Sequence, residues 1–342
     1  MHHEDIAFHN VGELVADAGR GPDGRLLQRV PESVRADLND GAKRRVRHPA
    51  GVELRFVPEE SVEVTLSVEP QNGVETSTVR VFWGPFQERV EHEIGPEPTT
   101  IEVSMPEKLE RIGPDVRSEL AFDPEVCRLR LPGEHRGGWV SYHGAAGERR
   151  PPREAEVPDL TYLAYGTSIT EGEAALGEHL TYVGQTANRL DADLVNLGTC
   201  GSNYCDAAMA DHIAAREDWD VATLALSVNM VGTFTPAEFR ERAANMVETV
   251  AAAHPEKPVV PITIYPNSRD LVPGHGEGEV CDRFREELRE IVAETDRENV
   301  TLLEGADLLT DVGGLTTDLV HPGDNAMVRM GERLADELEP LV

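Results

Sequence analysis

Ser168 is the residue of this sequence whose position best suits a nucleophile. It follows Gly166 and Thr167 directly, after an apolar run over residues 160–165 that predicts a short buried strand. A serine between a strand and a helix lies where open α/β sheets keep their ligand crevices, with its hydroxyl exposed and backbone N–H groups nearby. Taken alone, a serine at such a turn is more often a cap residue than a nucleophile. The role of Ser168 therefore depends on whether other segments supply the partners that a nucleophile needs.

An aspartate and a histidine near the C-terminus suit the acid–base work that a serine nucleophile needs. Asp318 lies three residues before His321, and Pro322 stiffens the loop ahead of a predicted final helix. At this spacing the carboxylate can hold one ring nitrogen, so that the other nitrogen is free to take a proton from a serine. The chain has 12 histidines, and His321 is distinguished from the others by this aspartate. The pair is therefore the predicted partner of Ser168.

Two further segments carry groups that can stabilise an oxyanion. Gly198 and Gly201 follow a predicted strand, and two glycines at this spacing allow a tight turn and close approach of backbone N–H groups to a substrate. Asn229 follows the next predicted strand, and its carboxamide can donate a hydrogen bond to a developing oxyanion. An ordinary turn or helix cap would explain either segment alone. Together with Ser168 and the aspartate–histidine pair, however, they supply all the parts of acyl transfer through a covalent acyl-enzyme.

The elements that would position these residues alternate between strands and helices from residue 159 onward. Such alternation predicts a parallel sheet with helices on both faces. The strands are predicted at residues 160–165, 193–197, 221–228, 258–264 and 300–303. The helices are predicted at residues 179–190, 204–217, 236–253, 279–296 and 324–338. Loops that include residues 268–280, rich in glycine and charge, are expected to form the pocket walls.

The first part of the chain has a different pattern. Its β-type runs are separated by Gly, Pro and Asn at intervals typical of antiparallel strands, with one short helix near residues 31–38. These runs lie at residues 52–56, 62–68, 79–83, 100–103 and 126–131. A chain of 342 residues is long for one core. We therefore predict an all-β, jelly-roll-like sandwich domain over residues 1–155 and an α/β domain over residues 156–342, joined by a charged, proline-rich linker at residues 147–158.

These motifs resemble those of the SGNH (GDSL-type) hydrolase superfamily. Gly166-Thr167-Ser168 stands for its first block, Gly201 for the second, Asn229 for the third, and Asp318 with His321 for the fifth. The segments at residues 165–170, 196–198 and 318–322, with residues 29–31 and 51–56 in the first part, are similar to a subgroup that carries an N-terminal β-sandwich. The chain departs from the family where Thr167 replaces the usual Asp, and where Ser227-Val228-Asn229-Met230 lacks the Gly and Asp that normally flank the Asn.

The resemblance implies a flavodoxin-like three-layer α/β/α hydrolase domain. It also implies ester hydrolysis or acyl transfer without a cofactor, with an oxyanion hole formed by the backbone N–H groups of Ser168 and Gly201 and the amide of Asn229. The predicted activity is cleavage of a carboxylic ester of a small molecule or of an acylated sugar. An α/β-hydrolase fits less well, because Thr170 occupies the second glycine position of the G-x-S-x-G motif.

Other activities stay open. An acyltransferase would move the acyl group from a thioester or ester donor to an alcohol, and a carbohydrate O-deacetylase is a variant of the esterase. A non-catalytic carbohydrate-binding protein is the alternative from another class. Separately, Trp83, Trp139 and Tyr142 are candidates for a sugar platform on the sandwich, although aromatic residues in strands usually belong to a core or an interface.

A metal site and an anion site are disfavoured. Cys200 and Cys205, with Asp206 and His212 nearby, have a C-x4-C spacing with no second pair, so we expect no zinc. The basic run at residues 44–47 is more often a solvated or salt-bridged face than an anion site.

The net charge indicates which solvent suits the chain and which binding partners are excluded. Asp and Glu number 63 against 32 Lys and Arg, a net charge of −31. Such a chain would repel nucleic acid and anionic membranes. The excess is spread along the chain, which suggests adaptation to a salt-rich cytoplasm, where screening limits self-repulsion. Four scattered cysteines, no apolar run near the ~20 residues of a membrane span and no secretory signal also favour a cytoplasmic protein. The oligomeric state stays open.

Overall fold

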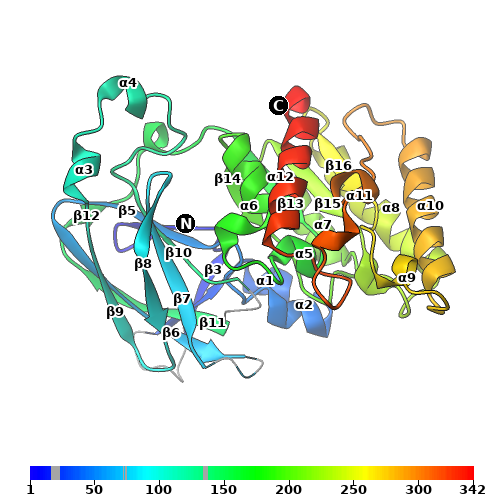
Figure 1. The fold of residues 1–342 in the computed structure, drawn as a ribbon, viewed down its shortest axis with the longest axis horizontal. Helices are drawn as coiled ribbons and strands as arrows, with labels where there is room; N and C mark the ends of the chain where they lie inside the picture. The colour runs from blue at the N-terminus through cyan, green and yellow to red at the C-terminus, as the bar shows by residue number, and fades with distance from the viewer. Residues whose placement is uncertain (17–23, 72, 74, 134–137) are drawn as a thin grey trace. The chain divides into compact units, whose positions relative to one another are not determined.

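The computed structural model describes residues 1–16, 24–71, 73, 75–133 and 138–342. They form two compact units, drawn in Figure 1. The first unit comprises Met1–Pro31, Val46–Leu160 and Asp191–Asp193. The second unit comprises Glu32–Arg45, Thr161–Leu190 and Leu194–Val342. The short segment Glu32–Arg45 thus belongs to the second unit although it precedes the rest of that unit by more than a hundred residues.

The first unit is a β-sandwich of two antiparallel sheets. One sheet has the order β1 (His2–His3), β2 (Ile6–His9), β5 (Glu53–Pro58), β10 (Cys127–Arg130), β7 (Ser77–Trp83) and β8 (Phe86–Ile94), with β12 (Arg149–Arg150) paired to β5. The other has the order β3 (Glu13–Ala16), β4 (Arg25–Gln28), β11 (Gly138–Ala146), β6 (Ser61–Pro70) and β9 (Thr99–Ser104). Two short helices, α3 (Glu107–Glu110) and α4 (Pro114–Arg117), follow β9.

Alternation of apolar and polar residues explains how the two sheets share a core. In β6, Val62 and Val64 are fully buried while Glu63 between them is exposed. Leu129 of β10, in the other sheet, belongs to the same hydrophobic cluster. Burial of one face of each sheet therefore holds the sandwich together.

Some of the strands that the sequence pattern did not predict, β8 and β11 among them, lack this alternation. Most of β8 is exposed at the edge of its sheet, so its sequence has few of the buried apolar residues that would mark a strand. β11 contains Gly138 and Gly144 and an irregularity in its pairing with β6 between Tyr142 and Gly144. Part of the segment predicted as a linker is instead a strand, because Arg149 and Arg150 pair with β5.

The second unit is a three-layer α/β/α fold, as predicted. Its sheet has the strand order β14 (Asp193–Asn196), β13 (Thr161–Tyr165), β15 (Val221–Ala225) and β16 (Val259–Ile262). This 2-1-3-4 order is that of flavodoxin-like sheets. The helices that follow these strands are α5 (Ser168–Glu171), α6 (Tyr182–Arg189), α7 (Ala207–Ala214), α8 (Pro236–Ala253), α9 (Ser268–Leu271), α10 (Gly278–Glu294), α11 (Gly305–Leu308) and α12 (Asp324–Leu338).

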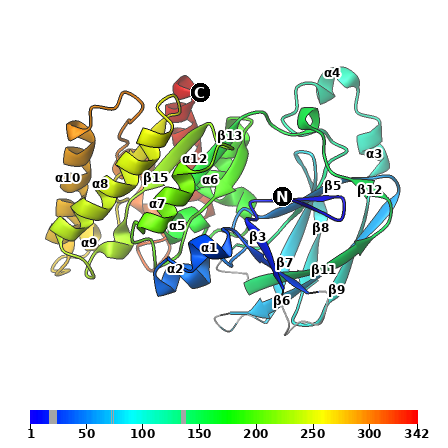
Figure 2. The ribbon, with the colours of Figure 1, turned by 180° about the vertical axis from the view of Figure 1, so that it is seen from behind.

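The helices cover both faces of this sheet. α6 and α12 pack together on one face (Figure 1), and α7 and α8 pack on the opposite face (Figure 2). α10 packs against α8 through the stacked rings of Phe239 and Phe284. Two short helices of the upstream segment, α1 (Glu32–Arg35) and α2 (Asp40–Arg45), complete the unit, with α1 against α7. α2 was not predicted from the sequence.

The predicted fifth strand at residues 300–303 is reduced to two parallel bridges, Val300 with Val259 and Leu303 with Ile262. Pro261 lies in the middle of β16 and has no N–H, so the central rung of the ladder is missing. β15 also ends earlier than predicted, at Ala225, and a 3₁₀ turn follows at Val228–Met230. The loop predicted at residues 268–280 contains α9 and the first turn of α10. None of the described helices combines the length and the apolar character that crossing a membrane requires.

Candidate active site

Ser168 is the first residue of α5, directly after the turn that ends β13. The turn needs a glycine, because a Cβ at Gly166 would lie 2.1 Å from Oγ1 of Thr170. The expected exposure of the Ser168 hydroxyl is not found, because only 3% of the residue is exposed and the surrounding turn encloses it.

Ser168, His321 and Asp318 form one hydrogen-bonded chain. Oγ of Ser168 lies 2.8 Å from Nε2 of His321. Nδ1 of the same ring lies 2.7 Å from Oδ2 of Asp318. The carboxylate thus occupies one ring nitrogen and leaves the other facing the hydroxyl, which is the arrangement that a general base requires.

Asp318 is held as a carboxylate by four hydrogen-bond donors. Partial burial by itself raises its pKa, but the ring N–H of His321, the backbone N–H groups of His321 and Val320 and the hydroxyl of Thr316 outweigh burial. These donors hold the pKa of Asp318 well below its usual value. Leu319 turns the backbone toward the carboxylate with a φ of +58°, a left-handed conformation that is unusual for leucine.

A small hairpin fixes the loop that carries Asp318 and His321. The Thr316 N–H donates to the His321 carbonyl at 2.8 Å, and the Gly323 N–H donates to the Gly314 carbonyl at 2.9 Å. α12 begins at the next residue, Asp324. The imidazole is therefore positioned by a closed loop anchored on a helix of 15 residues.

Two of the three predicted oxyanion donors, Gly201 and Asn229, lie in segments that hydrogen bonds tie together. Gly201 has a φ of +63°, which favours glycine, and is the exposed residue of a mostly buried loop after β14 that we call the Gly201 loop (residues 198–203). Oδ1 of Asn229 accepts a hydrogen bond from the Asn203 N–H at 3.2 Å. The Asn203 carbonyl accepts one from the hydroxyl of Ser227 at 2.5 Å. The oxygen of the Asn229 amide thus faces the Gly201 loop, and its nitrogen is left to donate elsewhere.

Two buried polar residues that the sequence analysis gave no role tie α5 to the Gly201 loop. Glu171 is fully buried, and its carboxylate accepts the Cys200 N–H. Asn196 donates to the Thr170 carbonyl at 2.9 Å and accepts the Gly198 N–H at 2.9 Å. The only signal in the sequence was a polar residue at the end of an apolar strand or in the first turn of a helix, which is too common to predict a role.

A small apolar crevice is lined by Thr167 and Ile169, the two chain neighbours of Ser168, although neither Ser168 nor His321 lines it. Its lining residues come from the ends of β13, β15 and β16 and from the histidine loop, and include Thr167, Ile169, Val228, Tyr265 and Val320. The volume of the cavity is about 10 Å³, room for about one water molecule.

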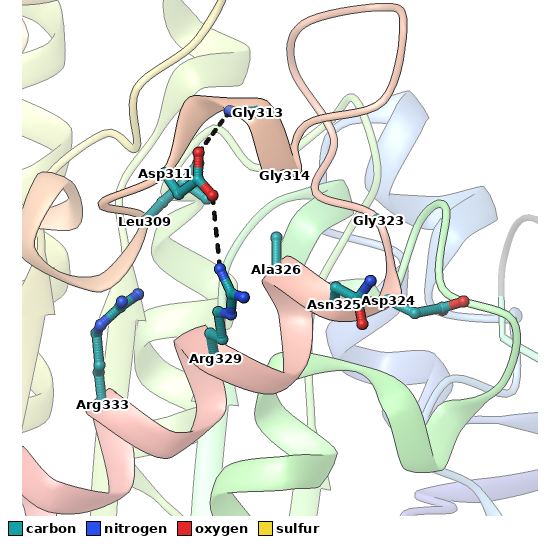
Figure 3. A pocket seen from close by; sticks show the side chains of 10 residues that line it. All are labelled: Leu309, Asp311, Gly313, Gly314, Gly323, Asp324, Asn325, Ala326, Arg329 and Arg333. Carbon is teal, nitrogen blue, oxygen red and sulfur yellow. Dashed lines mark hydrogen bonds and ion pairs between the residues drawn. The ribbon is translucent and has the colours of Figure 1, made fainter.

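A larger hollow, of about 350 Å³, lies along the first turns of α12 (Figure 3). Arg329 and Arg333 extend into it from the helix, and Arg329 lies 3.5 Å from the carboxylate of Asp311 on the facing loop. Neither Ser168 nor His321 lines this hollow, so it is separate from the hydrogen-bonded chain.

The aromatic residues weighed as a sugar platform do not form one. Trp83 and Tyr142 are buried in the sandwich core, with the Trp83 indole donating to Glu88 and the Tyr142 hydroxyl donating to Glu4. Trp139 lies three positions before Tyr142 in β11, on the other face of that strand.

The residues weighed as a zinc site are engaged elsewhere. Burial raises the pKa of the Cys205 thiol to about 12, which opposes the thiolate that a metal needs. Asp206 accepts hydrogen bonds from the backbone and side chain of Asn39. The described residues contain no group of three or more His, Cys, Asp or Glu side chains arranged to hold a metal ion.

A comparison with protein families finds a match for the second part of the chain. Residues 161–340, slightly more than half of the chain, match the model of the GDSL-like lipase/acylhydrolase family. No curated protein matches the chain significantly.

Similar solved structures cover nearly the whole chain. A salicylyl-acyltransferase from a tetracycline biosynthetic pathway has a TM-score of 0.77 at 18% identity, over 99% of this chain and 95% of that one. A putative GDSL-like lipase from Bacteroides ovatus has a TM-score of 0.69 at 17% identity, over 98% and 97%. A family two carbohydrate esterase from Cellvibrio japonicus has a TM-score of 0.61 at 14% identity, over 99% and 96%. At these identities the likeness concerns the fold.

Proposed function

The chain belongs to the GDSL-like lipase/acylhydrolase family, and on that premise we propose that it is a serine esterase that cleaves a carboxylic ester through a covalent acyl-enzyme. The observation that carries the proposal is the hydrogen-bonded chain from Oγ of Ser168 through His321 to Asp318, at 2.8 and 2.7 Å. The link between Ser168 and His321 has the length and the partners that proton transfer requires, and the link to Asp318 orients the ring.

The reaction begins when Nε2 of His321 takes the hydroxyl proton of Ser168 and Oγ attacks the ester carbonyl carbon. The negative charge moves to the former carbonyl oxygen, where the N–H groups of Ser168 and Gly201 and the amide of Asn229 stabilise it. The imidazolium, stabilised by Asp318, then protonates the departing alcohol, which leaves an acyl group on Oγ. Water attacks this acyl-enzyme with His321 again as the base, and the carboxylic acid is released.

We infer a short acyl group, because the crevice that is lined by the residues on either side of Ser168 is small. It has room for about one water molecule, so a group much larger than acetyl would have to displace Ile169, Val228 or Tyr265. Ile169 and Tyr265 are at least 95% buried, and such packed side chains yield only at a cost. A short-chain ester, on a small alcohol or on a sugar, is the substrate class that fits.

We test the esterase proposal with nitrophenyl esters from acetate to octanoate and with the Ser168→Ala variant. The expected kcat/KM is highest for acetate and falls with chain length. Ser168→Ala should lose turnover and labelling by a fluorophosphonate probe while it retains the wild-type melting temperature. Full residual activity in this variant would refute Ser168 as the nucleophile, and octanoate as the best substrate would refute the short acyl group. A folded wild-type protein that neither labels nor turns over would favour a non-catalytic binding role.

Acyl transfer is the second candidate, because the structural neighbour with the TM-score of 0.77 is a salicylyl-acyltransferase that aligns over 99% of this chain. The chemistry differs only in the last step, in which an alcohol replaces water. Product analysis with and without an acceptor alcohol separates the two. A transfer product that dominates at millimolar alcohol identifies a transferase, and free acid at all alcohol concentrations identifies a hydrolase.

A further inference from the structure

The Gly201 loop is held by residues 39–45, which precede it by more than 150 positions and belong to the same compact unit. Nδ2 of Asn39 donates to the Ser202 carbonyl at 2.9 Å. Gly41 packs so closely that a Cβ there would lie 2.6 Å from Cβ of Ser202. α2 therefore lies directly against the loop that carries one predicted oxyanion donor.

Arg45, the last residue of α2, reaches the peptide unit of that donor. Its Nε donates to the Cys200 carbonyl at 3.2 Å, and the hydroxyl of Ser202 donates to the same oxygen at 3.1 Å. The Cys200 carbonyl and the Gly201 N–H belong to one planar trans peptide, so they point in opposite directions. Whatever fixes the carbonyl therefore also sets the direction of the N–H.

We propose that Arg45 is a positioning residue of the active site, whose guanidinium orients and polarises the Cys200–Gly201 peptide so that the Gly201 N–H donates to the oxyanion. The inference rests on the proposed esterase function. A cation on a carbonyl oxygen forms a charge-assisted hydrogen bond, and polarisation of the peptide makes the N–H at its other end a stronger donor. Arg45 does not touch the substrate in this scheme, because the peptide unit lies between them.

The preceding peptide is fixed from the opposite side. The Cys200 N–H donates to the buried carboxylate of Glu171, three residues after Ser168 on α5. Cys200 thus has its N–H held by the helix of the nucleophile and its carbonyl held by α2. The loop cannot rotate the Gly201 N–H away without breaking one of these bonds. Arg45 lies outside residues 161–340, which match the family, so this part of the site comes from a segment that the family match does not include.

The test compares Arg45→Ala with Arg44→Ala, because Arg44 is the exposed neighbour on the same helix. Loss of a whole oxyanion donor lowers kcat by about a hundredfold or more, so weakening one donor should lower kcat about tenfold. We expect this fall in Arg45→Ala with acetate ester, with KM within about twofold of wild type, since ground-state binding does not use the oxyanion hole. Affinity for a boronic acid, which forms a tetrahedral adduct with Ser168, should fall by a similar factor.

Recovery of kcat in Arg45 variants distinguishes a positioning role of Arg45 from a role in folding alone. Arg45→Lys keeps a cation and should recover part of kcat. Millimolar guanidinium should raise the kcat of Arg45→Ala above that in equal sodium chloride, and leave Arg44→Ala unchanged. Melting temperatures show whether each variant is folded.

Several outcomes would overturn the inference. It is wrong if folded Arg45→Ala has the kcat and boronate affinity of wild type. It is also wrong if the variant is less stable and has a changed KM while its kcat stays that of wild type. It is also wrong if Arg44→Ala loses as much kcat as Arg45→Ala. Failure of the esterase proposal is distinguishable, because wild type itself would then neither turn over the ester nor react with fluorophosphonate, and both proposals would fall together.

Discussion

Asp318 accepts hydrogen bonds from four donors although half of its side chain is exposed to solvent. One oxygen serves the ring N–H of His321, and the other serves the backbone N–H groups of Val320 and His321 and the Thr316 hydroxyl. The carboxylate thus orders the loop and orients the imidazole at the same time. Because its pKa is held low, Asp318 stays ionised throughout the range in which esterases are assayed.

At this scale we predict that Asp318→Asn lowers kcat by about 10³-fold or more, because a neutral amide neither stabilises the imidazolium nor fixes the ring tautomer. The melting temperature should change little, since the side chain is half exposed. Acetate ester turnover and thermal unfolding check this. Asp311→Asn is the control, since Asp311 is an exposed aspartate of the neighbouring segment that faces the hollow of Figure 3. A loss in Asp318→Asn no larger than in the control would refute the role of the carboxylate.

The turn after β14 is the element on which the geometry of α5 depends. A Cβ at Gly198 would lie 2.4 Å from the backbone nitrogen of Glu171 and 2.8 Å from its Cα. A Cβ at Gly201 would meet no atom within 4 Å. The two glycines of the motif therefore serve different purposes: Gly198 lets two backbones approach, and Gly201 adopts a positive φ.

The pair gives a prediction at the scale of the element. Gly198→Ala must push α5, and with it Ser168, out of place, so we expect a loss of about 1–3 kcal/mol of stability and most of the activity. Gly201→Ala keeps its N–H and pays only the left-handed backbone cost of about 1–2 kcal/mol. Thermal unfolding and kcat of both variants, measured together, check this order. Equal loss of kcat in the two variants would contradict it.

Across the whole molecule, negative charge dominates the composition, but the first unit also buries a network in which arginines surround one carboxylate. Glu53 contacts Arg55 at 2.8 Å, Arg128 at 2.7 Å and Arg130 at 3.2 Å, and it is 4% exposed. Burial by itself raises the pKa of Glu53, but these arginines outweigh it and hold that pKa well below the usual value. Because the folded pKa is lowered, the network stabilises the fold above the unfolded value of about 4.3, and this contribution is lost as the pH falls through the folded pKa.

We therefore predict that Glu53→Gln lowers the free energy of unfolding by about 3 kcal/mol or more near neutral pH, since it leaves buried arginines without their shared partner. The gap to wild type should narrow once the pH falls below about 4.3. Urea unfolding at several pH values in molar KCl checks this, because salt screens the surface repulsion from the net charge of −31 far more than a buried pair. Glu63→Gln, at an exposed position of β6, is the control. A gap that does not depend on pH would contradict the linkage.

The sequence by itself determined the features that depend on local pattern. The helix predicted at residues 236–253 has those bounds in the structure, and its start is fixed by the capping box of Thr235 and Glu238 around Pro236. Alternation of strands and helices predicted a parallel sheet with helices on both faces, whereas the flavodoxin-like arrangement was implied by the family resemblance. Ser168, Asp318 and His321 could be named as partners because each lies in a short motif whose residue types suit one reaction.

Only the tertiary structure decided what depends on contacts between distant segments. The missing hydrogen bond at Pro261 reduced the predicted strand at residues 300–303 to two bridges, although the residues of that segment favour a strand. The sandwich strands without alternation could not be predicted from the sequence. The contacts of Glu171 and Arg45 with Cys200 join segments 29 and 155 positions apart, and nothing in their local sequence marks them. The local pattern of apolar and polar residues indicates which face of an element is buried. A hydrogen bond to a backbone atom of another segment produces no such pattern, so the contacts that hold the Gly201 loop could be found only in the tertiary structure.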